Sequence, residues 1–113
     1  MIDIQFRRKG SNFMSVEMSG HAEAGPYGYD VVCAAVSALS IGTVNSLSEI
    51  AEIPVEVVSA EDSGGYLEFT IPAGISQKQM ETGQILMKSL HLSLKSIEEE
   101  YSEYVKINSL KGK

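Results

Sequence analysis

The chain begins with two segments in which apolar and polar residues alternate. Residues 2 to 6 and residues 14 to 18 carry an apolar side chain at every second position, and Gly10, Ser11 and Asn12 lie between them. Because successive side chains of a strand point to opposite faces, this period predicts two half-buried strands. The glycine and polar residues between them predict a tight turn, so the chain is expected to open with a β-hairpin.

Two longer segments have the period of a helix. Apolar and small residues recur three or four positions apart from 31 to 51, and a second series of this kind forms a seam from Met80 to Tyr101. Asp30 is expected to be the N-cap of the first helix, and Ser76 with Gln79 has the spacing of a capping box that opens the second. The seam is long, so we expect either the sheet or a partner to cover it.

The remaining segments predict three more strands. Residues 54 to 58 and 66 to 71 favour strands on either side of a polar, glycine-containing turn, and residues 104 to 108 favour a last short strand. We therefore predict an α+β fold of order ββαββαβ, a small two-layer sandwich with two helices packed on a mainly antiparallel sheet. A chain of 113 residues supports one core, so residues 1–113 are expected to form a single domain.

The composition is that of an ordinary folded domain with an acidic charge. Hydrophobic residues make up 43% and charged residues 21%, and the formal net charge is −6. An acidic chain is poorly matched to phosphates, so we expect a basic protein as partner and no direct nucleic-acid binding. We find no apolar run of the roughly 20 residues that span a membrane and no N-terminal signal pattern, so a cytoplasmic protein without membrane contact is expected.

Cys33 is the single cysteine of the chain. A lone thiol forms no internal disulfide and suits a reducing compartment. If Asp30 is the N-cap, Cys33 is the third helical residue, where unpaired N–H groups and the helix dipole favour a thiolate and could donate to an oxyanion. Free cysteines are also common in protein cores, so ordinary packing of Cys33 is the alternative.

His21 and three neighbours complete a candidate site around Cys33. His21 ends the second strand, and the glycine-rich residues 20 to 30 could fold its imidazole back to the helix start, where it would be the base. Asp30 could cap the helix, orient His21, or both. Ser37 shares the helix face of Cys33, where its hydroxyl could hold the dyad or a substrate carbonyl, or bond the Cys33 carbonyl. His91 lies in mid-helix, and a surface or interface role is expected for it.

One stretch of sequence resembles a known family. The run Gly20-His21-Ala22, followed by Gly25, Gly28, Asp30 and Val32-Cys33-Ala34-Ala35-Val36-Ser37, resembles the ribosomal-processing cysteine proteases of the Prp family. The resemblance implies a catalytic dyad of His21 and Cys33, supporting roles for Gly20, Asp30 and Ser37, and no cofactor. It further implies a cytoplasmic homodimer that removes the N-terminal extension of large-subunit ribosomal protein number twenty-seven, cutting after a phenylalanine.

Several alternatives remain open at this point. Tyr27 and Tyr29 could offer apolar faces to a substrate phenylalanine, or they could anchor the loop. A non-catalytic protein that binds a ribosomal component would use the acidic surface and keep Cys33 in its core, and a thiol redox sensor would lack a resolving cysteine. One cysteine and two histidines at these separations match no metal-ligand spacing, so no metal site is expected.

Overall fold

The computed structural model describes residues 1–21, 28–60 and 64–111. Its elements are β1 (Ile2–Lys9), β2 (Asn12–Ser19), α1 (Tyr29–Glu49), β3 (Glu56–Ala60), β4 (Tyr66–Thr70), α2 (Gln77–Glu100) and β5 (Val105–Lys111). This is the predicted order ββαββαβ, and the predicted α+β class is confirmed.

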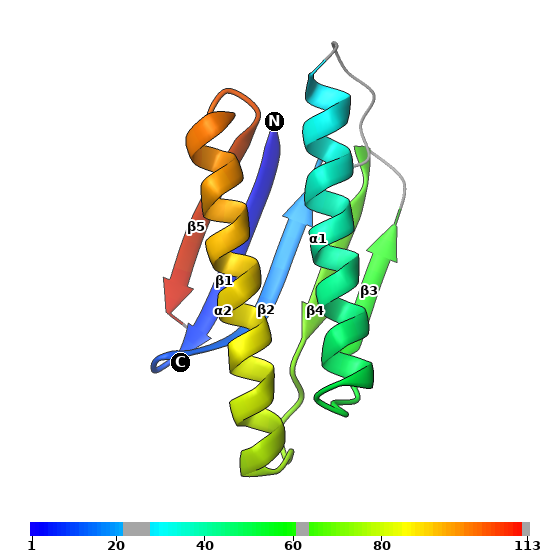
Figure 1. Cartoon of the computed structure of the whole chain (residues 1–113), viewed down its shortest axis with the longest axis vertical. Helices are drawn as coiled ribbons and strands as arrows, with labels where there is room; N and C mark the ends of the chain where they lie inside the picture. The colour runs from blue at the N-terminus through cyan, green and yellow to red at the C-terminus, as the bar shows by residue number, and fades with distance from the viewer. Residues whose placement is uncertain (22–27, 61–63, 112–113) are drawn as a thin grey trace.

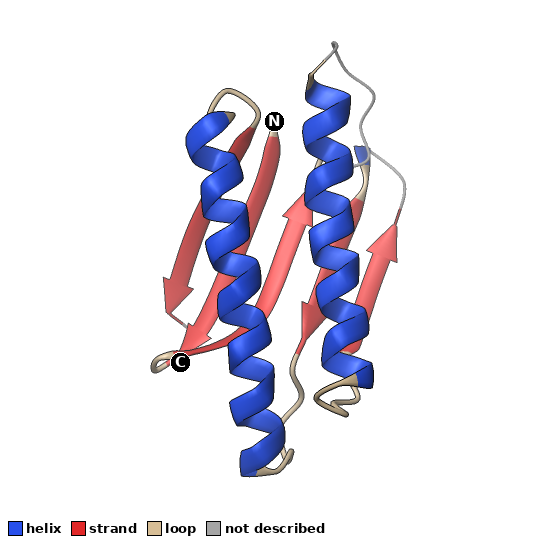
Figure 2. Ribbon diagram, viewed as in Figure 1, coloured by secondary structure: helices blue, strands red, loops and turns tan. Residues whose placement is uncertain are grey.

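The strands form one mixed sheet with both helices on the same face (Figures 1 and 2). The strand order is β3-β4-β2-β1-β5. β1 pairs with β2, β2 with β4 and β3 with β4, all antiparallel, whereas β5 lies parallel to β1. The prediction of a mainly antiparallel sheet under two helices is therefore confirmed, and β3 and β5 are the edge strands.

The core lies between the sheet and the two helices. Ile2, Ile4 and Phe6 point inward from β1 and are fully buried, and their registered neighbours Met18 and Val16 are buried on β2. Each such side chain contributes about 1.5–3 kcal/mol when it leaves water. The alternation that predicted the hairpin is thus the alternation between the core and the open face of the sheet.

The apolar seam of α2 is covered by the chain itself. Met87, Leu90 and Leu94 are buried against the rest of the core, and Gly83 brings α2 so close to Ile53 that an added Cβ would lie 2.8 Å from its Cδ1. The capping box of Ser76 and Gln79 is present as predicted. Of the two covers expected for the seam, the sheet layer is the one observed, so the seam gives no argument for a partner.

Three predicted boundaries were wrong. The first helix begins at Tyr29 instead of 31, because Gly28, with φ of 100°, is the N-cap. The segment from 54 begins its strand only at Glu56, since Val55 N–H still bonds the Ile53 carbonyl in the turn after α1. β5 continues to Lys111, because its later residues pair with β1 although they do not alternate in polarity.

α1 is long and apolar enough, by length and composition alone, to count as a candidate membrane span. The expectation that no run approaches that length was therefore wrong for Tyr29–Glu49. Core helices pass the same test, and one face of α1 does lie in the core through Val32, Val36 and Leu47. Composition of this helix is accordingly weak evidence for a membrane.

Candidate active site

Gly20 is the first residue after β2, which ends at Ser19. It has φ of 87°, and a Cβ at this position would lie 2.6 Å from the Met1 carbonyl oxygen, so only glycine fits without movement. Its N–H donates to the Gly65 carbonyl at 3.0 Å. The backbone of Gly20 is thus fixed by its neighbours, and with it the direction of its own carbonyl.

The Gly20 carbonyl accepts a hydrogen bond from the Cys33 thiol. Cys33 Sγ donates to it over 3.7 Å, and the Tyr29 hydroxyl donates to the same oxygen over 3.3 Å. Cys33 is 5% exposed. A thiol donates such a hydrogen bond and a thiolate cannot, because only the thiol carries a proton.

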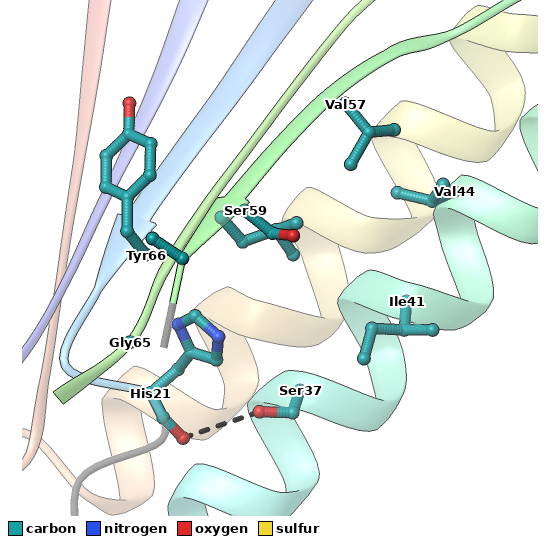
Figure 3. A pocket seen from close by; sticks show the side chains of 10 residues that line it. His21, Ser37, Ile41, Val44, Val57, Ser59, Gly65 and Tyr66 are labelled. Atoms are coloured by element: carbon teal, nitrogen blue, oxygen red, sulfur yellow. Dashed lines mark hydrogen bonds between the residues drawn. The ribbon is translucent and has the colours of Figure 1, made fainter. Parts of the chain in front are cut away.

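Ser37 makes the equivalent contact one turn further along α1. Its Oγ donates to the His21 carbonyl over 3.4 Å (Figure 3). Cys33 and Ser37 therefore reach two consecutive carbonyls, those of Gly20 and His21, since helical residues four apart lie on one face. Of the roles considered for Ser37, the one it takes here is to hold the backbone of His21 against α1.

The imidazole of His21 is half-buried just after the end of β2 and points into the pocket, toward Ser59, in Figure 3. Its Nδ1 is buried and has no hydrogen-bond partner among the described residues. Burial lowers the pKa of His21 below its ordinary value of 6.5. The side chain is therefore neutral at pH 7, which is the form that can accept a proton.

The helix start differs from the prediction in one respect that matters for the chemistry. Asp30 is not the N-cap; it is exposed and lies in the first turn, after Gly28 and Tyr29. Cys33 is consequently the fifth helical residue instead of the third, and it follows Val32, whose N–H already bonds the Gly28 carbonyl at 3.1 Å. The N–H groups that have no acceptor within the helix precede Val32, so Cys33 cannot supply one of them.

Tyr29 is a buried residue next to Gly20. It is 6% exposed, its ring packs on Tyr104 with centroids 5.4 Å apart, and its hydroxyl also accepts from the Met1 amine at 3.1 Å. Of the two readings of Tyr29, these contacts favour an anchor over a substrate-facing ring. Tyr27 lies outside the described residues.

A groove runs from His21 along α1. It lies between α1 and the edge strand β3 (Figure 3). Its volume is about 420 Å³. His21 and Ser37 lie at one end, and Ile41, Val44, Val57 and Leu67 line its length. Sequence reasoning missed this groove, because its walls come from segments whose neighbourhood depends on the strand order.

His91 is not part of this site. Its ring packs on Phe6 and Phe13, at centroid distances of 4.8 and 4.9 Å, and is half-buried, so the surface or interface role expected for it stays a prediction. Burial, together with the positive charges of Lys95 and Arg8, lowers the pKa of His91. Within the described residues there is no cluster of three His, Cys, Asp or Glu side chains that could hold a metal ion.

Comparison with known proteins places this chain among characterised relatives. The chain is 32% identical to the ribosomal processing cysteine protease Prp of Bacillus subtilis, over 96% of this chain and 97% of that protein. It is 31% identical to the Staphylococcus aureus protease of the same name, over 95% of each chain.

Two crystal structures show the same fold. A Streptococcus mutans protein superposes with a TM-score of 0.91 at 36% identity, over 99% of this chain and 96% of that one. The S. aureus ribosomal processing protease Prp, in complex with a substrate peptide, superposes with a TM-score of 0.82 at 28% identity, over 96% of this chain and 99% of that one. The model of the cysteine protease Prp family matches residues 1–106, and the chain belongs to that family of cysteine proteases.

Proposed function

We propose that this protease uses Cys33 as its nucleophile and His21 as its base, and that it trims a ribosomal protein. The observation that carries the proposal is the pair of contacts from Cys33 and Ser37 to the carbonyls of Gly20 and His21. These contacts hold Cys33 and Ser37 against two consecutive peptide carbonyls, the second of which belongs to the residue that carries the imidazole. Among the described residues Nδ1 of His21 has no hydrogen-bond partner, and burial lowers the pKa of the imidazole, so the proposed mechanism assigns the thiol proton to this ring.

In this mechanism the imidazole of His21 removes the proton of the Cys33 thiol, which first leaves the Gly20 carbonyl. The thiolate attacks the carbonyl carbon of the scissile bond and gives a tetrahedral oxyanion. The imidazolium returns the proton to the leaving amine, the C–N bond breaks, and a thioester remains on Cys33. Water then attacks the thioester with its proton going to His21, and collapse of that intermediate regenerates the thiol and releases the second product.

The substrate we propose is the N-terminally extended form of large-subunit ribosomal protein number twenty-seven, cut after a phenylalanine. The name of the relatives supports a ribosomal substrate. The net charge of −6 adds support, because ribosomal proteins are basic and opposite charges attract over a Debye length of about 8 Å at physiological salt.

The test is a cleavage assay with that extended ribosomal protein and mass analysis of its products. Wild-type protein should release one N-terminal fragment, whereas Cys33→Ala and His21→Ala should release none while keeping the circular dichroism and melting behaviour of a folded domain. Wild-type turnover by either purified variant would remove that residue from the mechanism. Cleavage at another site by wild-type protein would leave the dyad in place and reject the proposed substrate.

We also propose that the protein acts in the cytoplasm as a homodimer and without direct contact to nucleic acid. The resemblance to the family supports the dimer, and the exposed apolar side chains of Val31 and Ile41 on α1 offer a surface for it. The acidic charge opposes nucleic-acid binding. Light scattering at micromolar concentration should report twice the mass of 12.2 kDa, and a monomer would contradict the dimer.

A further inference from the structure

The carbonyl oxygen of Gly20 loses a hydrogen-bond donor in the first step of the proposed mechanism. In this structure it accepts from the Cys33 thiol over 3.7 Å and from the Tyr29 hydroxyl over 3.3 Å. A thiolate has no proton to donate, so deprotonation of Cys33 removes the first of these bonds. The remaining partner of this oxygen therefore affects how readily the thiolate forms.

The backbone of Gly20 gives this oxygen little freedom to turn toward water. Gly20 is buried, and its N–H donates to the Gly65 carbonyl at 3.0 Å. The Met1 carbonyl oxygen lies so close that an added Cβ would be 2.6 Å from it. A buried acceptor without a partner raises the free energy of the state that contains it. With Cys33 as its single donor, the oxygen would be such an acceptor in the thiolate state.

The Tyr29 hydroxyl is the donor that remains. Tyr29 is 6% exposed, and its ring packs on Tyr104 with 5.4 Å between the ring centroids. Its hydroxyl also accepts from the Met1 amine at 3.1 Å. None of these contacts involves the thiol, so the hydroxyl stays in place when Cys33 loses its proton.

We propose that Tyr29 is a positioning residue of the protease, whose hydroxyl keeps the Gly20 carbonyl hydrogen-bonded when Cys33 gives up its proton and thereby favours the thiolate. The same bond draws electron density from an oxygen 3.7 Å from the sulfur, which weakens its repulsion of the negative charge. Tyr29 acts through Gly20 and not on the reacting atoms. This proposal rests on the protease function proposed above.

Charged and titratable groups also surround these residues. The Met1 amine contacts the Tyr29 hydroxyl, and Asp30 follows Tyr29 in the first turn of α1. His21 is the proposed base, and the Tyr104 phenol belongs to the ring that packs on Tyr29. Each of these groups can make the reactivity of the thiol depend on pH. The test therefore compares two variants that both keep the amine, the carboxylate and the imidazole.

Tyr29→Phe and Tyr104→Phe are the matched pair. Each removes one hydroxyl from the same two packed rings, but the Tyr104 hydroxyl makes no hydrogen bond to the Gly20 carbonyl. Cys33 is the single cysteine of the chain, so the rate of alkylation by iodoacetamide across a pH series reports its thiolate, without any substrate. The second readout is kcat/KM for the extended ribosomal protein over the same series.

Tyr29→Phe should raise the pH midpoint of alkylation by about one unit and lower kcat/KM at pH 7 by about tenfold. The loss of kcat/KM should shrink as the pH rises, because the thiolate then forms without the hydroxyl. Tyr104→Phe should keep the wild-type midpoint. If Tyr29→Phe instead lowers kcat/KM by the same factor at every pH and leaves the midpoint unchanged, Tyr29 has a structural role alone and the proposal is wrong.

The outcomes separate this proposal from the protease function. Equal alkylation midpoints for Tyr29→Phe and Tyr104→Phe, with wild-type protein active, would refute the role of Tyr29 and leave the dyad standing. Wild-type protein that does not cut the extended ribosomal protein would reject that substrate, and the alkylation midpoints would still decide the role of Tyr29. If Tyr29→Phe does not fold, Tyr29→3-fluorotyrosine replaces it. Its more acidic hydroxyl is the stronger donor and should lower the midpoint, so an unchanged midpoint would refute the proposal.

Discussion

Replacing Gly20 by alanine should damage both the fold and the site. Alanine at a positive φ costs about 1–2 kcal/mol, and Gly20 has φ of 87°. Its new Cβ would also lie 2.6 Å from the Met1 carbonyl oxygen, which is closer than such atoms approach, so backbone must move. Overpacking of this kind costs about 1–3 kcal/mol, which brings the expected loss to about 2–5 kcal/mol.

Gly10 provides the matched control for this change. It also has a positive φ, of 63°, but a Cβ there would meet nothing within 4 Å. Gly10→Ala therefore carries the backbone strain and the same change in the unfolded chain, without the collision. The difference between the two variants, about 1–3 kcal/mol, isolates the contact with Met1.

Urea unfolding followed by circular dichroism gives the free energy of unfolding of both variants. Turnover measured under conditions where both are folded gives the second readout. Gly20→Ala should also be slow, because its carbonyl would no longer be placed to receive the Cys33 thiol, whereas Gly10→Ala should cut at the wild-type rate. Unfolding free energies that agree within about 0.5 kcal/mol for the two variants would refute the close approach to Met1.

Four further predictions concern single groups. Gln84→Leu should cost about 2–4 kcal/mol in urea unfolding, because it leaves the Phe13 N–H and carbonyl, now bonded at 2.7 and 2.8 Å, buried and unpaired. Ser37→Ala should cost about 1 kcal/mol and slow turnover, and Ser37→Thr should restore both if the bond to His21 is what matters. As pH falls below 6.5, His21 is protonated in the unfolded chain before it is protonated in the folded chain, so the free energy of unfolding should decline from pH 6.5 down to the lowered pKa of the folded state. Over the same range kcat/KM should decline, because the proposed base becomes protonated. A flat pH profile for kcat/KM would contradict the role of His21. Asp30→Asn should change stability by less than about 1 kcal/mol, since Gly28 is the N-cap, and a tenfold loss of turnover would show that its charge acts on the dyad.

The elements that the sequence predicted well are those in which one face is buried. Alternation located β1 and β2, because their inward residues fill the core and their outward residues do not. The capping box located the start of α2, because the Ser76 side chain itself accepts a hydrogen bond from a main-chain N–H of the first turn.

The predictions failed where the determining interaction has no side chain or comes from another segment. Gly28 is the N-cap of α1 and has no side chain that would mark it, so the pattern indicated the nearest polar residue, Asp30, instead. β3 is exposed throughout and has no buried face to give a period. The Cys33 thiol donates to the main-chain carbonyl of Gly20, and no pattern of residue types marks such a contact, although the sequence did mark both residues.

The parallel pairing of β5 with β1 has a consequence for how the chain folds. It pairs Ile2 with Val105, which are separated by almost the full length of the sequence. The entropy of closing so long a segment is lost before the strand contacts lower the free energy. During synthesis the β1–β2 hairpin and α1 leave the ribosome well before β5 exists. Until then β1 is an open edge whose inward residues, Ile4 and Phe6 among them, are apolar, so the nascent chain has a period in which it can pair wrongly with other strands.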